Sequence, residues 1–245
     1  MKIEGAVALV TGANRGIGSA FVGELLARGA GTVYAGARNA DSVRVSDPRI
    51  IPVTLDVTDP GHVSAVAEKL SDVSLVVNNA GVLTRDFPLQ ASAQEARRQI
   101  ETNYIALISM TSAFAPVLAR NGGGAFVNML SVVSFVGAPW MTTYSASKAA
   151  AWNYTNAARS QLAGQGTEVL GVHAGYVDTD MSAGVDADKI DPRSVARAGL
   201  DALEAGQPEV LIDDFTRNIK AGLSNDQNLI YPQVARDFAA MAATG

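Results

Sequence analysis

The sequence predicts a single α/β domain, residues 1–245, built on a doubly wound parallel sheet of about seven strands with helices on both faces. Short runs rich in β-branched residues alternate with longer helical patterns along the chain, which is typical of such sheets. The chain is 48% hydrophobic, enough to bury one large core. We find no linker and no internal repeat that would divide it into domains.

Strands and helices are expected to follow one another in order. Seven short apolar runs are expected to form strands: Ala6–Thr11, Thr32–Gly36, Ile50–Leu55, Leu75–Asn78, Ala125–Leu130, Val169–Val172 and Val210–Ile212. Five longer segments are expected to form helices: Gly16–Arg28, Pro60–Leu70, Ala93–Arg120, Thr142–Leu162 and Pro192–Ala205. Between Gly36 and Ile50 there is little room for a full helix, so we expect a short or irregular crossover there.

The first strand ends at a glycine-rich turn that opens the first helix, Thr11-Gly12-Ala13-Asn14-Arg15-Gly16-Ile17-Gly18. Free backbone N–H groups and the helix dipole at such a turn form an anion site. Gly12 would allow the tight turn, Gly16 a close approach to a pyrophosphate, and Gly18 close packing of helix on sheet. The spacing differs from GxGxxG and turns often contain glycine, so the position directly after a strand supports this interpretation.

Tyr144 and Lys148 lie four residues apart in the predicted helix Thr142–Leu162, and therefore share one face. A free tyrosine titrates near pH ~10, and a fixed positive charge beside it favours the phenolate. Such a pair is suited to acid/base chemistry. Taken alone, the pair is better explained as a surface tyrosine and an unrelated lysine on a helix.

Together these residues resemble the short-chain dehydrogenase/reductase family, from about Ile3 to Met181. The landmarks of this resemblance, in chain order, are the glycine turn, Asp56-Val57, Asn78-Asn79-Ala80-Gly81, Asn103, Ser131, Tyr144 and Lys148. The resemblance implies a Rossmann fold. It also implies an oxidoreductase of the carbonyl-reductase-like branch, which interconverts ketones or aldehydes and alcohols by hydride transfer.

The resemblance also implies catalytic roles. Tyr144 would be the general acid/base, and Ser131 would donate a hydrogen bond to the carbonyl oxygen. Lys148 would hold the ribose hydroxyls of the nicotinamide half and, together with the oxidised ring, lower the Tyr144 pKa. Asn103 would hold a water that links the lysine to solvent, with a plain surface asparagine as the alternative. Ser134 competes with Ser131, although Ser131 has the spacing to the tyrosine that the family shows.

The end of the second strand indicates which nicotinamide cofactor is used. A carboxylate there binds the ribose 2′-hydroxyl, whereas an arginine accommodates a 2′-phosphate. Arg38 follows the strand and no acid does, and Arg15 is expected to be a second cation near the same corner. NADP(H) is therefore the expected cofactor. Asp41 could instead pair with Arg38, and an NAD-dependent alcohol dehydrogenase remains an alternative.

Further cofactor contacts are implied at the strand ends. Asp56 and Val57 would touch the adenine ring, while Thr58 or Asp59 would cap the helix that begins at Pro60. The full predicted cofactor set is Gly12, Asn14, Arg15, Gly16, Ile17, Gly18, Arg38, Asp56, Val57, Asn79, Ala80, Gly81, Tyr144, Lys148, Gly175, Val177 and Thr179.

The substrate side follows the fifth and sixth strands. Five residues are predicted to line a cavity for an apolar or aromatic substrate, with simple core packing as the alternative: Val133, Trp140, Met141, Tyr176 and Met181. The Met181–Pro192 segment is too short for an elaborate lid, so we expect an open pocket. Ala174 stands where the family usually has proline, and His173 is expected to be a strand-end residue rather than a catalyst.

Composition excludes several other classes of protein. The chain has no cysteine and two histidines, so no metal site is expected. A net charge of −5 without a basic block argues against nucleic acid as a partner. Without a signal pattern or a stretch of eighteen apolar residues, we expect a cytoplasmic protein that does not use a membrane.

The C-terminal part, residues 179–245, is expected to supply a substrate-side helix, the last strand and an atypical tail that begins after Asp213. Family tetramers usually end in an Asp-Gly-Gly-like strand, which this chain lacks. A homodimer through the helices Ala93–Arg120 and Thr142–Leu162 is expected, and a tetramer is in doubt. A non-catalytic NADP(H)-binding sensor or interaction protein is the rival function, because fold does not determine function.

Overall fold

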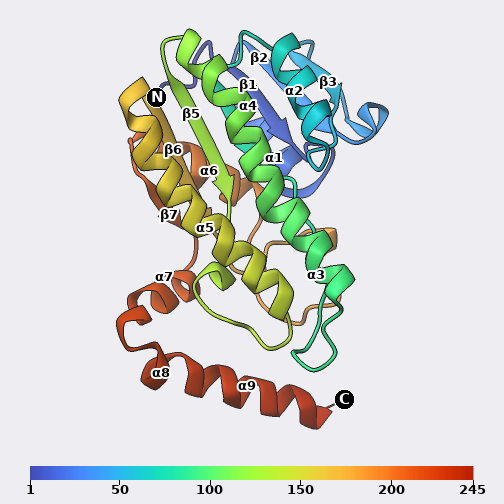
Figure 1. Ribbon diagram of the computed structural model, residues 1–245, viewed down its shortest axis with the longest axis vertical. Helices are drawn as coiled ribbons and strands as arrows, with labels where there is room; N and C mark the ends of the chain where they lie inside the picture. Colours follow the sequence, from blue (N-terminus) through green and yellow to red (C-terminus); the bar gives the residue numbers. More distant parts are fainter. Residues whose placement is uncertain (245) are drawn as a thin grey trace.

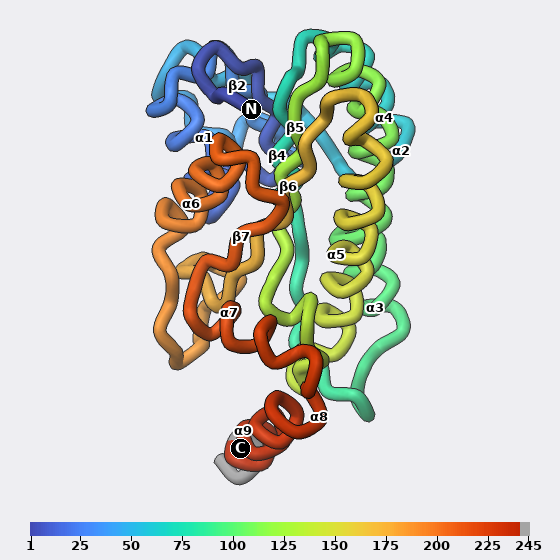
Figure 2. The backbone as a smooth tube through the Cα atoms, turned by 90° about the vertical axis from the view of Figure 1, so that its left-hand side faces the viewer, coloured from blue at the N-terminus to red at the C-terminus, as the bar shows by residue number. Residues whose placement is uncertain are grey.

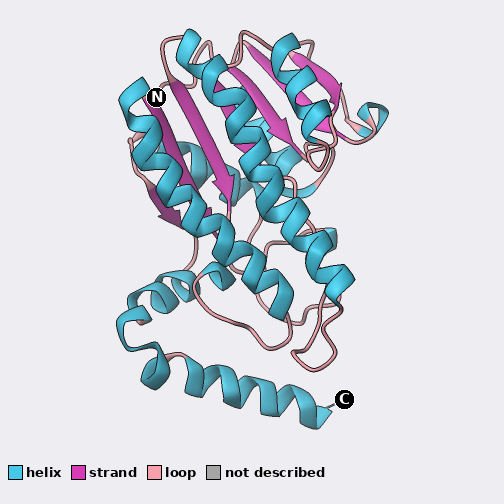
Figure 3. Cartoon of the chain, in the orientation of Figure 1, coloured by secondary structure: helices cyan, strands magenta, loops and turns pink. Residues whose placement is uncertain are grey.

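Seven parallel strands, in the order β3-β2-β1-β4-β5-β6-β7, form the sheet of this computed structural model, which describes the backbone of residues 1–244 and the side chains of residues 1–240 (Figures 1 and 3). The strands are β1 (Val7–Thr11), β2 (Thr32–Ala37), β3 (Ile50–Thr54), β4 (Leu75–Asn78), β5 (Gly124–Met129), β6 (Thr167–His173) and β7 (Glu209–Leu211). The predicted α/β class and the doubly wound parallel sheet are confirmed. Gly245, the last residue of the predicted domain, lies outside the described residues.

The strand order reverses between β1 and β4, since the chain first builds outward through β2 and β3 and then returns to the other side of β1. Ligands of doubly wound sheets bind at such a switch point, beyond the carboxyl ends of the strands. In Figure 3 the loops that follow these ends gather at one end of the sheet. This is the end where most of the predicted site residues lie.

Helices cover both faces of the sheet (Figure 2). One layer holds α1 (Gly16–Ala27) and α6 (Pro192–Glu204), and the other holds α2 (Pro60–Lys69), α4 (Ala106–Arg120) and α5 (Thr142–Leu162).

Strand side chains alternate between these two layers, as the pleat of a strand requires. Val10 packs with Phe21 of α1 in one core cluster, whereas the neighbouring Leu9 packs with Phe114 of α4 in the other. All four are fully buried. Complete burial of such a side chain contributes roughly 1.5–3 kcal/mol, so these apolar runs fix the sheet between its helices.

Local signals explain where several elements begin. Asp59, not Thr58, caps α2, because its carboxylate accepts a hydrogen bond from the N–H of His62 at 3.0 Å and Pro60 occupies the first turn. The crossover from β2 to β3 contains only a short 3₁₀ turn, Ala40–Ser42, as expected.

The long helix expected over Ala93–Arg120 is not continuous α-helix. It consists of α3 (Ala93–Ile100), a π-helical turn (Glu101–Ile105) and α4. The wide turn coincides with Asn103, whose side chain accepts from the N–H of Val82 and donates to its carbonyl, both at 2.9 Å. π turns of this kind often mark functional sites.

By length and composition alone, this helical segment is also long and apolar enough to cross a membrane. However, 44% of its most apolar window is buried inside the protein, and α4 supplies Phe114 and Leu118 to the core. A core helix therefore explains its composition.

The C-terminal tail, which was expected only as an extension, forms three helices: α7 (Asp214–Ala221), α8 (Asp226–Leu229) and α9 (Tyr231–Thr244). Asp213 begins this region by capping α7 through the N–H of Thr216 at 2.8 Å. The helices lie beyond the carboxyl ends of the strands, and α9 crosses this end of the molecule next to the end of α5 (Figure 1). We call residues 222–240 the strap.

Candidate active site

The glycine turn is held against the end of β4 by two polar side chains. The hydroxyl of Thr11 accepts hydrogen bonds from the N–H groups of Asn79 and Ala80, both at 3.0 Å. The Asn79 amide donates to the carbonyls of Thr11 at 2.9 Å and Gly12 at 3.2 Å. Both amide protons of Asn79 are thus used to brace the turn, a role that the sequence analysis did not assign.

Three glycines are required by the geometry of the turn. Gly12 and Gly16 have φ of +63° and +54°, in the left-handed region that favours glycine. A Cβ on Gly18 would collide with the Gly12 carbonyl and would lie 2.6 Å from Nδ2 of Asn79. No side chain caps the first turn of α1, so its N–H groups are available to an anion.

The loop after β6 faces the glycine turn. A Cβ on Gly16 would lie 3.1 Å from Cγ2 of Thr179, and Ile17, Val177 and Thr179 line one cavity. The N–H of Gly175 donates to Asp213 at 2.9 Å, which holds the start of this loop. The fold therefore brings together predicted cofactor residues from the glycine turn and from the loop after β6, which lie far apart in the sequence.

Arg15 is paired with an acidic residue, and its expected place as a second cation near Arg38 stays a prediction. Its guanidinium forms an ion pair with Asp180 at 2.7 Å, and both side chains are more than two-thirds exposed. Exposed pairs contribute about 0–1 kcal/mol, so this contact holds Arg15 only weakly. Arg38 is exposed directly after β2 and forms no ion pair with any described residue, which rules out the alternative pairing with Asp41 in this structure.

Asp56, at the end of β3, accepts hydrogen bonds from the hydroxyl of Thr58 at 2.7 Å and from its N–H at 2.9 Å. These bonds lower the pKa of Asp56, and the positive charge of Arg38 adds to the effect. The neighbouring Val57 is buried. The carboxylate therefore stays ionised close to Arg38, and its predicted contact with adenine remains a prediction.

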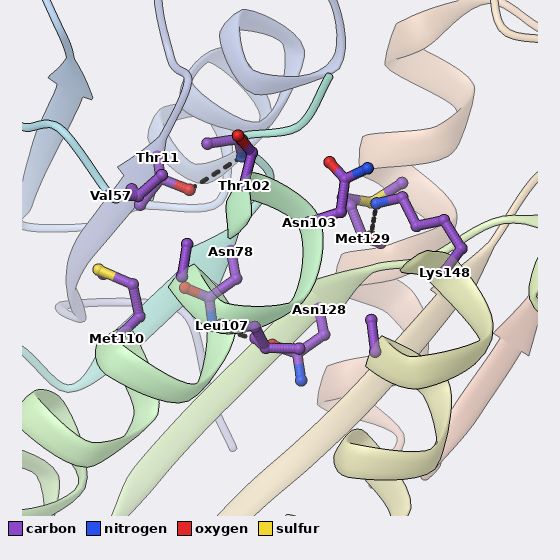
Figure 4. A pocket seen from close by; sticks show the side chains of 13 residues that line it. Thr11, Val57, Asn78, Thr102, Asn103, Leu107, Met110, Asn128, Met129 and Lys148 are labelled. Atoms are coloured by element: carbon purple, nitrogen blue, oxygen red, sulfur yellow. Dashed lines mark hydrogen bonds between the residues drawn. The ribbon is translucent and has the colours of Figure 1, made fainter. Parts of the chain in front are cut away.

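Tyr144 and Lys148 lie one turn apart on α5 and are both buried, with exposed fractions of 8% and 5%. The Lys148 ammonium lies 5.8 Å from the centroid of the Tyr144 ring and donates a hydrogen bond to the Met129 carbonyl at 2.9 Å (Figure 4). The hydroxyl of Ser131 forms a hydrogen bond with the Tyr144 phenol. Three of the four predicted catalytic side chains thus meet at the end of β5.

Burial raises the pKa of Tyr144 to about 12, and the Ser131 hydrogen bond only partly opposes it. Burial also lowers the pKa of Lys148 to about 8. In the protein alone, burial outweighs any effect of the Lys148 charge, and the ammonium bonds to Met129. The expected lowering of the Tyr144 pKa by Lys148 together with the oxidised nicotinamide ring stays a prediction. At neutral pH the phenol keeps its proton, so it is suited to donate rather than accept one.

The two candidate serines have different roles. Ser134 Oγ accepts the N–H of Ser131 at 3.2 Å, and it caps the short 3₁₀ turn Val132–Ser134 together with Ser131. Of the two, Ser131 lines a cavity of about 540 Å³ that Tyr144 also lines. The geometry therefore favours Ser131 for the catalytic role.

Asn103 and Lys148 line a small internal cavity of about 20 Å³, enough for one water molecule (Figure 4). Asn78, which also lines it, has a buried Oδ1 without a hydrogen-bond partner among the described residues. The Asn103 amide additionally donates to the hydroxyl of Ser147 at 2.9 Å. Asn103 is thus a fixed, buried group and not a surface residue, while its water-holding role remains a prediction.

A second, larger cavity of about 540 Å³ begins at Ser131 and Tyr144. All five predicted substrate residues line it: Val133, Trp140, Met141, Tyr176 and Met181. Further lining residues come from outside the predicted set, from the loop after β4 and from the tail: Leu83, Arg85, Phe215, Asn218, Ile219, Leu229, Ile230, Gln233, Val234 and Asp237. The pocket is therefore more enclosed than expected, because the tail supplies the wall that the Met181–Pro192 segment is too short to form.

Comparison with known proteins agrees with this geometry. The family model described as short chain dehydrogenase matches residues 6–190, most of the chain. The chain belongs to the short-chain dehydrogenase/reductase family of oxidoreductases.

Individual relatives cover most of the chain. It is 30% identical over 196 residues to the 3-oxoacyl-[acyl-carrier-protein] reductase FabG of Escherichia coli, covering 77% of this chain and 80% of that protein. It is 32% identical over 193 residues to the enzyme of the same name from Thermotoga maritima, covering 74% and 78%. A solved structure of a short chain dehydrogenase from Burkholderia cenocepacia in complex with NADP has a TM-score of 0.91 and 40% identity, covering 96% of this chain and 99% of that chain.

His173, at the end of β6, is a structural residue in this family member. Its Nδ1 lies 3.0 Å from the Ser131 carbonyl, and its ring stacks on Phe135 at 4.3 Å. Burial lowers the pKa of His173 to about 3, so its 3.2 Å approach to Glu209 is not an ion pair. The ring supports the backbone at Ser131, which agrees with the expectation that it is no catalyst.

Asp86 is a second supporting residue, which the sequence analysis missed. Its buried carboxylate accepts hydrogen bonds from the N–H of Thr143, at 3.1 Å, and from the Thr143 hydroxyl. A carboxylate at this position satisfies the first turn of α5 and interacts favourably with the helix dipole. It thereby fixes the start of the helix that carries Tyr144 and Lys148. A carboxylate 57 residues away in the chain gives no local signal of this contact.

Proposed function

We propose that this chain is an NADP(H)-dependent carbonyl reductase, which reduces ketones or aldehydes to alcohols and catalyses the reverse reaction. The observation that carries the proposal is that buried Ser131 and Tyr144 line an apolar cavity, with buried Lys148 one helical turn from Tyr144 on α5. The names of the relatives support it, since the E. coli protein is a 3-oxoacyl reductase and the B. cenocepacia structure contains NADP.

The residues present fit a nicotinamide dinucleotide. A Cβ on Gly81 would lie 3.1 Å from Oδ1 of Asn103 and 3.8 Å from the Lys148 ammonium, so the missing side chain leaves space beside the lysine. The uncapped N-terminus of α1 suits a pyrophosphate. Arg38 is free of ion pairs among the described residues, which supports the proposal that it binds a 2′-phosphate.

NADPH, when bound, supplies the hydride for the carbonyl carbon. Tyr144 donates its proton to the carbonyl oxygen, and Ser131 donates a hydrogen bond to the same oxygen as negative charge develops there. Because burial raises the pKa of Tyr144, the phenol holds at neutral pH the proton that the reduction needs. The apolar wall around it excludes water from the reacting atoms.

The proposal is tested by following NADPH oxidation with a panel of ketones and aldehydes, and by repeating the active pairs with NADH. We expect turnover that depends on the carbonyl compound, and a kcat/KM at least about tenfold higher with NADPH, the effect of one charged hydrogen bond. Equal efficiency with NADH would remove the role given to Arg38. Cofactor binding without turnover of any carbonyl would support the non-catalytic rival.

Two further proposals concern the assembly and its location. We propose that the chain forms a homodimer through the helical segment Ala93–Arg120 and α5, and that it is cytoplasmic. Gel filtration with light scattering tests the first, and cell fractionation tests the second.

A further inference from the structure

The strap is attached to both sides of the large cavity. At the start of α9, the hydroxyl of Tyr231 accepts a hydrogen bond from the N–H of Gly137, in the segment between β5 and α5, at 3.3 Å. Further along α9, the ring of Phe238 packs against Phe87, in the loop after β4, at 5.8 Å between centroids. Both flanking loops belong to the end of the molecule where the catalytic residues lie. The strap therefore spans the cavity instead of trailing away from it.

The strap presents apolar side chains to the cavity. Leu229, Ile230 and Val234 all line it, and Ile230 is 4% exposed. Two polar residues of α9 also line it, but Gln233 donates to Asp237 at 2.6 Å and accepts from Arg236 at 2.7 Å. Because the Gln233 amide is bonded within α9, the contribution of the strap is mainly apolar.

Large apolar side chains are exposed where the strap meets the rest of the cavity wall. Met181 is 44% exposed, Phe215 59% and Leu229 62%, and all three line this cavity. Exposed apolar clusters on soluble proteins mark sites that bind an apolar ligand or partner. Here the three exposed side chains line the same cavity as Ser131 and Tyr144. This arrangement favours an apolar ligand that reaches the catalytic residues.

Resting on the proposed function, we propose that the substrate is a ketone or aldehyde with a large apolar group, and that Ile230 and Val234 of the strap limit the size of that group. The cavity of about 540 Å³ is large for a small carbonyl compound and is in the range that encloses drug-sized ligands. The wall at Ile17, Val177 and Thr179 belongs to the proposed cofactor site, so the substrate takes the part between the catalytic residues and the strap.

The test compares Val234→Trp, which fills the cavity, with Ala235→Trp, an adjacent exposed position of α9 that does not line it. The substrates are methyl ketones with alkyl chains of increasing length, each measured as kcat/KM with NADPH. Val234→Trp is expected to lower the ratio of long-chain to short-chain efficiency by about tenfold or more, mainly through KM. Ala235→Trp is expected to leave the ratio unchanged, and Ile230→Ala to move the preference to longer chains.

Several results would overturn the proposal. An unchanged ratio in Val234→Trp, or the same change in Ala235→Trp, would show that the strap does not contact the substrate. A second copy of the chain is the other candidate for the exposed rim. If Leu229→Glu dissociates an oligomer and leaves the chain-length preference intact, the rim is a subunit interface.

The outcomes also separate this inference from the proposed function. If the wild-type protein reduces no ketone or aldehyde, the proposed function fails. If it reduces short and long ketones and Val234→Trp changes nothing, only the role of the strap fails. Displacement of an apolar fluorescent dye by a long-chain alcohol reports binding without turnover. Val234→Trp should weaken that displacement, and Ala235→Trp should not.

Discussion

The two sides of the cleft are built in different ways. On the cofactor side, the glycine turn and the strand ends are fixed by hydrogen bonds between neighbouring segments, such as those of Thr11 and Asn79. On the substrate side, apolar side chains from the loop after β4, from β5 to α5, and from the tail meet around one cavity. The first side presents backbone groups in fixed positions, whereas the second presents shape and apolar surface.

This difference shows which parts of the site tolerate change. Backbone donors that must meet a phosphate leave no room for an added atom, as the contacts around Gly18 show. An apolar wall can change its volume and still exclude water, so it can change the preferred substrate without ending the chemistry. Variants on the cofactor side should therefore affect binding and folding, and variants of the strap should affect selectivity.

The largest effect is expected at the catalytic residues, where both sides meet. Tyr144→Phe removes the proposed proton donor and should lower kcat for carbonyl reduction by about 10²–10⁴-fold. NADPH affinity, measured by fluorescence titration, should be nearly unchanged. Tyr154→Phe is a matched control on the same helix, where the ring packs against Tyr104 at 6.2 Å. Substantial activity in Tyr144→Phe would mean that another group donates the proton.

The next largest effect is expected at the glycine turn on the cofactor side. Gly18→Ala places a methyl group against the Gly12 carbonyl and Asn79. It should destabilise the fold by about 1–3 kcal/mol and weaken NADPH binding. Gly23→Ala, in the same helix, meets nothing within 4 Å and should gain up to about 1 kcal/mol. Urea unfolding and cofactor titration measure both. Equal stability of the two variants would contradict the close packing at the turn.

A smaller effect is expected at the corner of the cofactor site. Arg38→Ala should weaken NADPH binding about tenfold and leave NADH binding unchanged, since only NADPH carries the 2′-phosphate. Arg44→Ala, at another exposed arginine of the same crossover, should leave the affinity for both NADPH and NADH unchanged. Calorimetric titration of both cofactors distinguishes these cases. Equal weakening of both cofactors would assign Arg38 a different role.

The last prediction concerns the stability of the fold rather than activity, through the buried charge of Lys148. Unfolded Lys148 keeps its proton up to its ordinary pKa of 10.5, whereas the folded residue loses it from about 8. Between these values the unfolded state binds more protons, so this group makes the free energy of unfolding rise with pH, by up to about 1.4 kcal/mol per pH unit. Lys148→Met should remove that rise and be the more stable protein at pH 7. Urea unfolding from pH 7 to 10 measures the free energy of unfolding of the wild-type protein and of Lys148→Met. The same pH dependence in both proteins would contradict the burial of a charged lysine.

Most of the fold and the cofactor side could be predicted from the sequence, because their signals are local. Each apolar run marked a strand, and the glycine turn directly follows β1. Tyr144 and Lys148 were recognisable because a helix places residues four apart on one face.

The features that could not be predicted depend on contacts between segments that are distant in the sequence. The π turn at Asn103 exists where its amide meets Val82, 21 residues earlier in the chain, and nothing in the local pattern indicates it. Arg15 pairs with Asp180 through the fold rather than with its neighbours in sequence. The pKa of Tyr144 depends on how completely the folded protein buries it. The sequence analysis did not assign the strap to the substrate cavity. Its role there depends on its position in the fold, which its helical pattern does not indicate.

The most direct test of the central claim follows the hydride itself. NADPH carrying deuterium at the transferred position of its nicotinamide ring is incubated with the wild-type protein and a reducible apolar ketone, and the alcohol is analysed by mass spectrometry. The account predicts one deuterium on the carbinol carbon with the wild-type protein and almost none with Tyr144→Phe over the same time. An unlabelled alcohol, or labelled alcohol formed equally well by both proteins, would contradict it.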